Sequence, residues 1–414
     1  MTAFVLFLPC AAGVEDYLAA EVLRICGPAA QTQTARGGVT LHGEWADILR
    51  LNLHSRLTQR VLVRLFQGGY RGEQDLYAAA MSVPWEEWFG QRSSFKIEVT
   101  AQHSPLKSLN FAALKIKDAV ADRFRDKFGA RPDVETRHPD VRIFAHLTAD
   151  ALTLYIDTSG EPLFKRGWRE DKGDAPLKET LAAAMIAASG WDGTTPLYDP
   201  CCGSGTIAIE AAQVACNIAP GLLRRFGFET LLRHDRAAWA AQKDEAMAAR
   251  RPAAAPVFGS DVAFRMVDFA VRNARRAGVE QAVQLRGGDA LQRMPPSDVP
   301  GVMLLNPPYG ERIAAAGVAG THRAGRERAQ VNEGGDFFAQ LATHWKKNYA
   351  GWTAWVLSPD LKLPTRMRLK ESRRVPMWNG PIECRLLRFD MVRGSARAPS
   401  SSPADPTDAA APGA

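Results

Sequence analysis

Asn306, Pro307, Pro308 and Tyr309 are the residues with the clearest chemical potential in the chain. An amine on an aromatic base is a poor nucleophile, because its lone pair is delocalised into the ring. The Asn306 side-chain oxygen and the Pro307 carbonyl could accept both amine hydrogens and aim the lone pair at an electrophile. The prolines fix the local φ angles, and Tyr309 offers a face for stacking an extruded base. These four residues predict a catalytic site for a base amine; the alternative is a rigid proline turn.

A second segment, PLYDPCCGSGT at 196–206, predicts a cofactor site. A strand ending at Asp199 runs into a loop with Gly203 and Gly205, which lets the backbone and a helix N-terminus approach a ligand. The loop lacks the Lys-Ser/Thr pair of a phosphate-binding loop. Asp199 would repel a phosphate but suits an amino-acid ammonium, which favours S-adenosylmethionine over a dinucleotide. The predicted loop contacts are Asp199, Pro200, Gly203, Ser204, Gly205 and Thr206.

Two more acids end strand-like runs farther along the chain. Asp261 ends PVFGSD and can accept both hydroxyls of a ribose, and Asp289 ends AVQLRGGD and suits an adenine amine. Asp261 lies much farther from the loop than the usual ~20 residues, so we expect residues 217–252 to be a mostly helical insertion. The alternative role for Asp261 is that of a helix N-cap. Together with Asn306, these acids predict one crevice at the carboxyl ends of the strands.

The cysteines and histidines predict no metal site and no nucleophile. The six cysteines form no CxxC pair, so neither zinc nor a disulfide framework is indicated, and a reducing compartment fits. Cys201 and Cys202 flank the loop, and we interpret them as small packing residues rather than methyl acceptors. Spacing suggests no Ser/His/Asp set.

Alternating helices and strands from Pro176 to about Met391 must position these residues. This pattern is typical of a mostly parallel sheet with helices on both faces. Upstream, the patterns predict strands at 3–8, 37–43 and 94–101, helices at 14–25, 45–55 and about 110–128, and a β-hairpin over 141–157. The Ala/Pro/Ser-rich residues after about Gly394 are expected to be disordered.

Length and composition set the broad class. A chain of 414 residues with 46% hydrophobic and 23% charged residues is an ordinary globular protein of two or three units. No window approaches the ~20 apolar residues of a membrane span. The N-terminus has no basic region before its apolar run, so no signal peptide is expected. We therefore expect a cytoplasmic protein without a membrane partner.

A formal charge of +7 is compatible with an RNA partner, although an arginine-rich proteome is an equal alternative. Basic residues gather on a predicted helix near 110–128, beside an exposed sheet edge, and in the segment 158–175. A solvated surface is the other interpretation of this helix. The candidate RNA contacts are Lys115, Lys117, Arg123, Lys165, Arg166 and Arg169.

Several stretches resemble the RlmL-like family of THUMP-containing ribosomal RNA guanine-N2 methyltransferases. They include APLKETLAAA (175–184), LYDPCCGSGTIAIEAA (197–212), FGSD (258–261), NPPYGER (306–312) and NGPIECRL (379–386). The resemblance implies an α/β protein: a ferredoxin-like unit (1–55), a THUMP RNA-binding domain (56–157), a linker (158–175), a class I Rossmann-like methyltransferase domain (176–391) and a tail (392–414).

Carried over by position, the resemblance gives the loop residues, Asp261, Asp289 and Asn306–Tyr309 the roles described above. It also places Lys178-Glu179-Thr180 beside the cofactor pocket. The chain departs from the family in an apparent insertion at 314–332. A second methyltransferase domain, present in some relatives, does not follow here, so one reaction is expected.

The function expected is S-adenosylmethionine-dependent methylation of guanine N2 in 23S ribosomal RNA. A transfer-RNA guanine-N2 or adenine-N6 enzyme remains open, because the amine motif cannot separate these substrates. A non-catalytic RNA assembly factor would not need intact acids and an intact Asn306–Tyr309 motif. Protein glutamine methylation uses a similar motif, but the basic N-terminal half argues against it.

Overall fold

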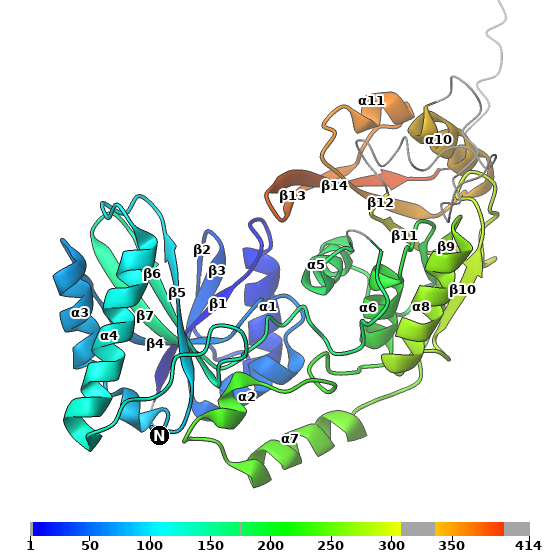
Figure 1. Ribbon diagram of the computed structural model, residues 1–414. Coiled ribbons are helices and arrows are strands. Elements are labelled where there is room, and N and C mark those ends of the chain that lie inside the picture. The colour runs from blue at the N-terminus through cyan, green and yellow to red at the C-terminus, as the bar shows by residue number, and fades with distance from the viewer. Residues whose placement is uncertain (1–2, 174–175, 308–335, 393–414) are drawn as a thin grey trace, which may run out of the picture.

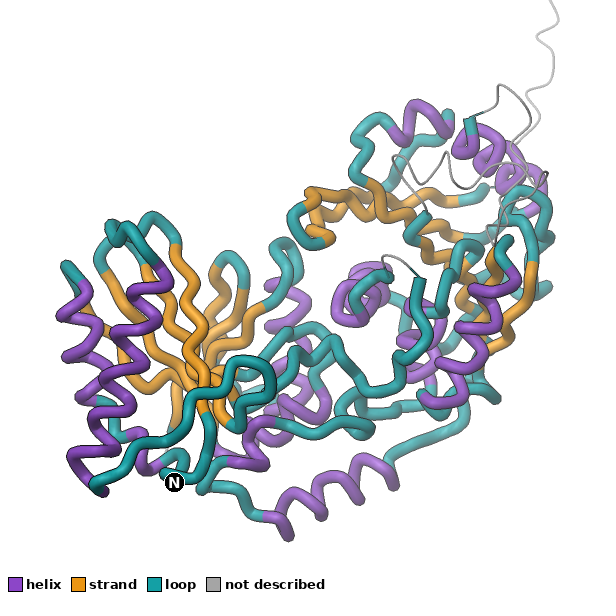
Figure 2. Tube along the Cα trace, viewed as in Figure 1, coloured by secondary structure: helices purple, strands orange, loops and turns teal. Residues whose placement is uncertain are grey.

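The computed structural model describes residues 3–173, 176–307 and 336–392. Two seven-stranded sheets dominate the molecule, one formed by the first 157 residues and one by residues 197–390 (Figure 1). The first part of the connection between them, residues 158–178, is loop throughout its described residues, as Figure 2 shows, and helix α5 follows it. Among the described residues, no helix combines the length and the apolar composition that crossing a bilayer requires.

The first sheet joins the two predicted N-terminal units into one structure. Its strand order is β2-β3-β1-β4-β7-β6-β5, so β1 of the first unit pairs with β4 of the second. The strands are β1 (Phe4–Pro9), β2 (Thr32–Ala35), β3 (Gly38–Gly43), β4 (Leu62–Gly69), β5 (Phe95–Ala101), β6 (Val141–Leu147) and β7 (Ala151–Asp157). The helices are α1 (Glu15–Cys26), α2 (Trp45–His54), α3 (Glu73–Ser82), the 3-10 turn η1 (Trp85–Glu87) and α4 (Leu109–Phe128).

The predicted hairpin and the basic helix are confirmed. In β6, alternate residues from Val141 to Leu147 are buried, and the strand pairs antiparallel with β7. Helix α4 begins where the Ser108 side chain accepts the Phe111 N–H at 3.2 Å, which caps a free backbone donor. It ends at Gly129, whose φ of 75° suits a residue without a Cβ.

The second sheet has the strand order β10-β9-β8-β11-β12-β14-β13, which is 3-2-1-4-5-7-6 when the strands are numbered within this half. The strands are β8 (Leu197–Asp199), β9 (Val257–Asp261), β10 (Val283–Gly287), β11 (Val302–Leu305), β12 (Thr353–Ser358), β13 (Arg373–Asn379) and β14 (Ile382–Asp390). Strand β14 pairs antiparallel with β12 and with β13, and the other strand pairs of this sheet are parallel. The predicted mostly parallel sheet is confirmed.

Helices cover both faces of this sheet. Leu197 and Leu304 share a buried cluster with residues of α5 and α6, whereas Tyr198 and Met303 belong to a separate cluster with residues of α10. Successive strand residues face opposite ways, so the two clusters mark the two faces. The helices are α5 (Glu179–Ser189), α6 (Thr206–Ala215), η2 (Gly227–Thr230), α7 (Arg236–Ala248), α8 (Phe264–Arg276), α10 (Phe337–Asn348) and α11 (Leu363–Met367).

The insertion at 217–252 is less helical than expected. Only η2 and α7 are helical, and the remaining residues form turns and loop. The insertion reaches back to the N-terminal half, because the Gly221 N–H donates to the Leu53 carbonyl at 3.0 Å. Backbone N–H groups of the insertion thus bond to carbonyls of the N-terminal half. These N–H groups are then not available for the hydrogen bonds of a regular helix.

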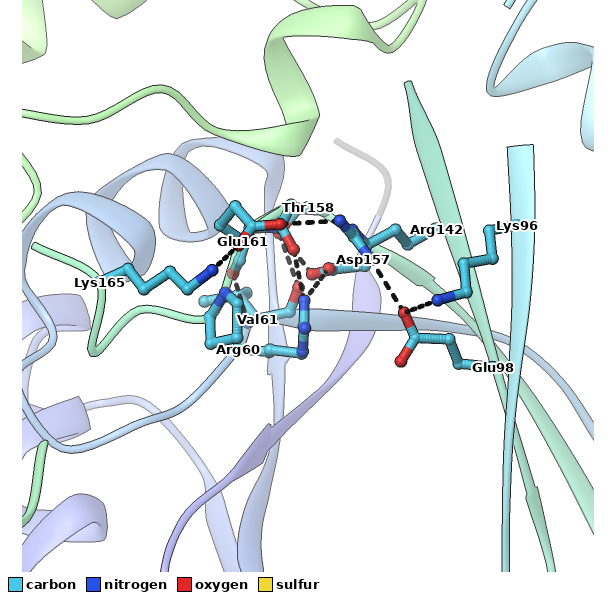
Figure 3. A network of polar contacts seen from close by, with 12 residues as sticks. Arg60, Val61, Lys96, Glu98, Arg142, Asp157, Thr158, Glu161 and Lys165 are labelled. Atoms are coloured by element: carbon cyan, nitrogen blue, oxygen red, sulfur yellow. Dashed lines mark hydrogen bonds and ion pairs between the residues drawn. The ribbon is translucent and has the colours of Figure 1, made fainter. Parts of the chain in front are cut away.

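Charged residues fasten the end of the first sheet to the chain that follows it (Figure 3). Arg60 forms an ion pair with the buried Asp157, and Arg142 bridges Glu98 and Glu161. Burial raises the pKa of Asp157 to about 6, against the opposing effect of Arg60. The segment after β7 therefore leaves the sheet through a polar junction.

Candidate functional site

The carboxyl ends of β8, β9, β10 and β11 form one edge of the second sheet, called here the carboxyl edge. Asp199 lies opposite Gly259 in the register of β8 and β9, and Gly287 of β10 lies opposite Asp261. Tyr198 lies opposite Met303, so Asn306 follows β11 next to the end of β8. The strand order reverses between β8 and β11, which is where open α/β sheets bind ligands. The structure thus brings together Asp199 and Asn306.

The glycine loop, residues 200–205, depends on two backbone conformations that favour glycine. Gly203 and Gly205 have φ angles of 52° and 90°. A Cβ on Gly205 would also lie 3.0 Å from the Ala270 Cβ of α8. Gly205 is the N-cap of α6 and provides no side-chain acceptor, so the first N–H groups of this helix lie at the loop without a cap. This arrangement suits close contact between backbone and a ligand.

Asp199 is a buried carboxyl at the base of this loop. It is 1% exposed, and its Oδ1 accepts the Cys201 N–H at 3.1 Å. Burial, with a smaller contribution from Asp261, raises the pKa of Asp199 to about 8. A cation beside this carboxyl would favour its ionised form. Asp199 therefore fits the ammonium group of an amino-acid-bearing cofactor.

Asp261 organises the glycine loop and keeps room for a further partner. Its two oxygens accept N–H groups of Gly203 and Ala263, each at 2.9 Å. An ionised carboxylate has about four acceptor positions, so about two remain for a ribose. The N-cap of α8 is Ala263, without a side-chain cap bond, so Asp261 is not the helix cap considered as the alternative. Burial raises its pKa.

Asp289 lies two residues beyond the end of β10. Its Oδ1 accepts the Leu291 N–H at 2.9 Å, and the residue is half-buried. This contact holds the side chain at the carboxyl edge while leaving the second oxygen for a partner. The placement is compatible with the predicted adenine contact.

Asn306 follows β11 directly, and its Oδ1 is buried without a hydrogen-bond partner among the described residues. Such an atom is uncommon, because most buried polar atoms are paired. An acceptor kept in this state suits a donor brought by a ligand, such as a base amine. Pro307 is buried, and Pro308 and Tyr309 lie outside the described residues, as does the predicted insertion at 314–332.

Cys201 and Cys202 are not activated nucleophiles in this structure. Burial, assisted by the charge of Asp199, raises the pKa of both thiols well above the ordinary value. A thiolate is the reactive form of cysteine, so these residues stay protonated. This supports their interpretation as packing residues. Among the described residues, no group of three or more His, Cys, Asp or Glu side chains could hold a metal ion.

Arg169 belongs to the support of the glycine loop. Its guanidinium donates to Glu179 Oε1 at 2.7 Å, to Ser204 Oγ at 3.0 Å and to Thr206 Oγ1 at 2.8 Å. The sequence predicted an RNA contact for Arg169, and the family resemblance placed Glu179 beside the cofactor pocket. The two predicted cofactor-contact hydroxyls, Ser204 and Thr206, instead have an intramolecular donor here.

Asn273 is a loop-supporting residue that the sequence did not reveal. Its buried side chain donates to the carbonyls of Ser204, at 3.1 Å, and Asp171, at 2.8 Å. It lies on the buried face of α8, which Val267, Ala270 and Ala274 also form. The one available signal was a lone asparagine on the apolar face of an amphipathic helix, which alone identifies no partner.

Arg166 does not fit the RNA role predicted for it. Its side chain is 1% exposed and forms an ion pair with the buried Glu210, and it donates to the carbonyls of Leu163 and Arg56. A phosphate has no surface to approach there. The linker segment packs against α6, and this long-range packing turns a basic residue inward.

The other four RNA candidates lie on the surface with different degrees of freedom. Arg123 donates to both oxygens of Glu86, at 2.7 Å each. Lys117 pairs with its neighbour Asp118, and Lys165 pairs with Glu161. The Lys115 ammonium lies 5.5 Å from the centre of the partly exposed Phe111 ring. Lys115 is therefore the candidate on α4 with no acidic partner among the described residues.

Three family models match consecutive segments of the chain. An RlmL ferredoxin-like domain matches residues 5–62, a THUMP domain matches residues 70–157, and an RMKL-like methyltransferase domain matches residues 166–388. The last match spans more than half of the chain. The expected combination of ferredoxin-like, THUMP and methyltransferase units is confirmed.

Curated relatives carry the name Ribosomal RNA large subunit methyltransferase K/L. The protein of Shewanella amazonensis is 38% identical over 388 residues, which is 92% of this chain and 52% of the relative. That of Psychromonas ingrahamii is 37% identical over 391 residues, or 92% of this chain and 50% of the relative. The chain spans about half the length of these relatives.

Solved structures share the fold over nearly the whole chain. A protein described as a methyltransferase complexed with SAH has a TM-score of 0.81 and 27% identity, with 95% of this chain and 100% of that chain covered. A protein from Listeria monocytogenes, described as a predicted N6-adenine-specific DNA methylase, has a TM-score of 0.79 and 26% identity, with 94% and 96% covered. The class I methyltransferase fold expected from the sequence is confirmed.

Proposed function

The chain belongs to the RMKL-like methyltransferase family, and from this premise we propose that it is an S-adenosylmethionine-dependent enzyme that methylates ribosomal RNA. The names of the curated relatives support ribosomal RNA as the substrate. The THUMP match supports an RNA-binding N-terminal half. An enzyme with this substrate works where ribosomes are made, so a cytoplasmic location accompanies the proposal.

The carboxyl edge supports the cofactor. Asp199 would hold the ammonium group, Asp261 the ribose hydroxyls and Asp289 the adenine amine, while Gly203 and Gly205 let the backbone lie close. When bound, the cofactor supplies a methyl group on a positively charged sulfur. The chain's own residues bind and orient the cofactor and the base.

The observation that carries the proposal is the unpartnered Oδ1 of Asn306, buried beside the end of β8. We propose that it and the Pro307 carbonyl accept the two hydrogens of the guanine N2 amine. This contact orients the nitrogen lone pair toward the cofactor side of the crevice, and catalysis is then mainly positioning. Pro308 and Tyr309 complete the proposed site, with Tyr309 stacking on the base.

A second candidate base is adenine, methylated at N6. The Listeria protein described as a predicted N6-adenine-specific DNA methylase favours it, because that protein shares the fold at 26% identity. Guanine N2 and adenine N6 are both exocyclic amines with two hydrogens. The contact proposed for Asn306 serves either, so the base must be identified chemically.

The test is transfer of labelled methyl groups to RNA from a strain that lacks the protein. Ribosomal and transfer RNA are separated after the reaction, and their nucleosides are identified by mass spectrometry. We expect label in N2-methylguanosine of 23S RNA. Label in N6-methyladenosine would select the second candidate base, label in transfer RNA would replace the proposed substrate, and unlabelled RNA would contradict the function.

A further inference from the structure

A cavity of about 530 Å³ lies between the end of the first sheet and the start of α5. We call it the linker groove. The segment from Glu161 to Glu179 forms most of its lining, and Arg224 and Arg225 of the insertion close it. An RNA that contacts the N-terminal half and enters the carboxyl edge must pass from one half to the other, and the groove lies at this junction.

The described lining of the groove is strongly basic. It contains seven Lys or Arg side chains and three Glu side chains, a formal excess of four positive charges against seven for the whole chain. Four of the cations are already engaged: Arg166 with Glu210, Arg169 with Glu179, Lys165 with Glu161, and Arg224 with four backbone carbonyls.

The other three cations, Lys172, Lys178 and Arg225, are exposed and form no ion pair among the described residues. They come from the linker, from the residue before α5 and from the insertion, so three separate segments place a charge around one cavity. Unpaired cations around a concave surface attract a polyanion, because each phosphate contact releases counterions.

An aromatic ring accompanies these charges. Phe164 is half-buried in the lining, and the Lys178 ammonium lies 5.1 Å from the centre of its ring. A basic groove with an aromatic side chain is the common design for single-stranded nucleic acid, where bases stack on rings and cations contact phosphates. The volume is that of a small-molecule pocket, which suits one or two nucleotides and excludes a duplex.

The groove is also joined to the proposed active site. Arg169 and Glu179 belong to its lining, and the Arg169 guanidinium contacts Ser204 and Thr206 of the cofactor region. We propose that the linker groove binds an unpaired segment of the substrate RNA, with phosphates on Lys172, Lys178 and Arg225 and a base on Phe164. This inference deepens the proposed function and rests on it.

The first test removes the three unpaired cations in the full-length chain as Lys172→Ala/Lys178→Ala/Arg225→Ala. The control, Arg36→Ala/Lys243→Ala/Arg250→Ala, removes equal charge outside the groove, and Lys243 lies over Trp239 as Lys178 lies over Phe164.

The probe is a labelled single-stranded RNA of about 12 nucleotides, within the usual site size. We expect the slope of log affinity against log salt to fall by about 2 for the groove variant and little for the control. Equal slopes for the two variants would overturn the proposal.

The second test concerns the ring. Phe164→Ala should weaken binding of the same oligonucleotide by about 5-fold or more, and Phe164→Tyr should restore it, because stacking needs an aromatic face. Phe164→Leu keeps apolar bulk without that face. If the leucine variant binds as tightly as the tyrosine variant, a base does not stack on this residue and the proposal is wrong.

Methyl transfer to 23S RNA separates this inference from the proposed function. If the unaltered chain methylates the RNA and the groove variant keeps its kcat/KM, the function stands and the groove assignment fails. If the unaltered chain binds S-adenosylmethionine but methylates no RNA, the proposed function fails, and the oligonucleotide slopes alone then decide the groove. The expected result is methylation by the unaltered chain with a KM raised at least about 10-fold in the groove variant.

Discussion

Asn306 is the residue whose state most directly indicates a reaction. Its buried oxygen has no partner among the described residues, and an unpaired buried acceptor costs about 1–3 kcal/mol. A protein can keep such an unpaired acceptor at a binding site, because the ligand supplies the missing hydrogen-bond donor. Under the proposed function, this oxygen is free to accept a hydrogen of the base amine when the substrate binds.

We predict that Asn306→Ala lowers kcat for RNA methylation by about 100-fold or more, because the amine loses the acceptor that orients it. Affinity for S-adenosylmethionine should change by less than about 3-fold, since the acids at the carboxyl edge hold the cofactor. Single-turnover kinetics and calorimetric cofactor titration measure the two effects. Parallel loss of both would contradict the assigned role.

The raised pKa of Asp199 predicts that cofactor binding releases a proton from this carboxyl. Its pKa rises from the ordinary value of 3.8 to about 8 in the structure, so near pH 7 the carboxyl holds a proton. An ammonium beside it would favour ionisation, so binding should release part of a proton. Cofactor affinity should therefore increase as pH rises from about 6 to about 8.

Calorimetry at pH 7 in two buffers of different ionisation enthalpy counts the released protons. Asp199→Asn removes the titrating group, so its release should be close to zero and its weaker affinity should vary little with pH. The raised pKa of Asp199 also lowers the stability of the unaltered chain, because its folded state keeps a proton that the unfolded chain gives up above about pH 4. The unfolding free energy of the unaltered chain should thus fall relative to the variant between pH 4 and pH 8. Equal proton release by both chains would exclude Asp199 as the source.

At the scale of elements, the Arg169–Glu179 pair connects three segments: the linker, α5 and the glycine loop. The side chains are 11% and 4% exposed. The Arg169 guanidinium also donates to the hydroxyls of Ser204 and Thr206. Removing one partner of a buried pair leaves an uncompensated charge, which typically costs 3–5 kcal/mol. Removing both leaves no such charge.

We predict that Arg169→Ala and Glu179→Ala each lower the unfolding free energy by about 3 kcal/mol, and that the double variant is less destabilised than the sum. Denaturant unfolding measures all four chains of the cycle. Arg169→Ala should also weaken cofactor binding about 10-fold, because the loop hydroxyls lose their donor. Additive single effects would show that the pair is not a unit.

The elements most readily predicted were those with strong periodicity. Strand β1, helices α1, α2 and α4, and the β6–β7 hairpin were expected close to where they lie, because apolar residues repeat at the spacing of each element. Strand β2 was missed because Thr32–Ala35 is polar and mostly exposed. Strand β4 was missed although Leu62–Phe66 is a mostly apolar run, and helix α3 was missed because its apolar residues follow no clear helical spacing.

The acids and Asn306 could be expected at one edge because parallel strands present their carboxyl ends together. The side chains with which each arginine pairs could not be predicted from the sequence. Arg166 and Arg169 appear equivalent in the sequence, yet one is buried on Glu210, 44 positions away, and the other holds the glycine loop. The assigned roles of the site residues and the boundaries at 55, 157, 175 and 391 stay predictions.

At the scale of the whole molecule, the two halves are joined by buried polar contacts. Arg56 of the first half donates to the Ile218 carbonyl of the second, and the Arg166 guanidinium bonds both the Arg56 carbonyl and Glu210. Such contacts fix distance as well as orientation. The N-terminal half is thereby held at a defined position relative to the carboxyl edge, which a flexible linker would not provide.

The same polar contacts decide where the N-terminal half can be separated. The buried Asn52 side chain donates to Thr158 Oγ1 at 2.9 Å and accepts from Ser159 Oγ at 2.6 Å, and Ser159 Oγ also accepts the Val61 N–H. All of these partners lie after the predicted domain end at residue 157. A fragment that stops there leaves the Val61 N–H without its acceptor and leaves Asn52 with only its bond to the Ile48 carbonyl.

We predict that residues 1–160 bind structured ribosomal RNA with strong salt dependence, since phosphate contacts dominate such binding. Residues 1–157 should be less stable by about 1–3 kcal/mol, the usual cost of unsatisfied buried groups. Filter binding from about 50 to 200 mM salt measures the first effect, and denaturant unfolding measures the second. Asn52→Ala in the longer fragment is the control, because it removes the Asn52 bonds to Thr158 and Ser159 at an unchanged length. If that variant were as stable as the unaltered fragment, the bonds to Thr158 and Ser159 would not determine the boundary, and salt-insensitive binding would exclude this half as the RNA-gripping unit.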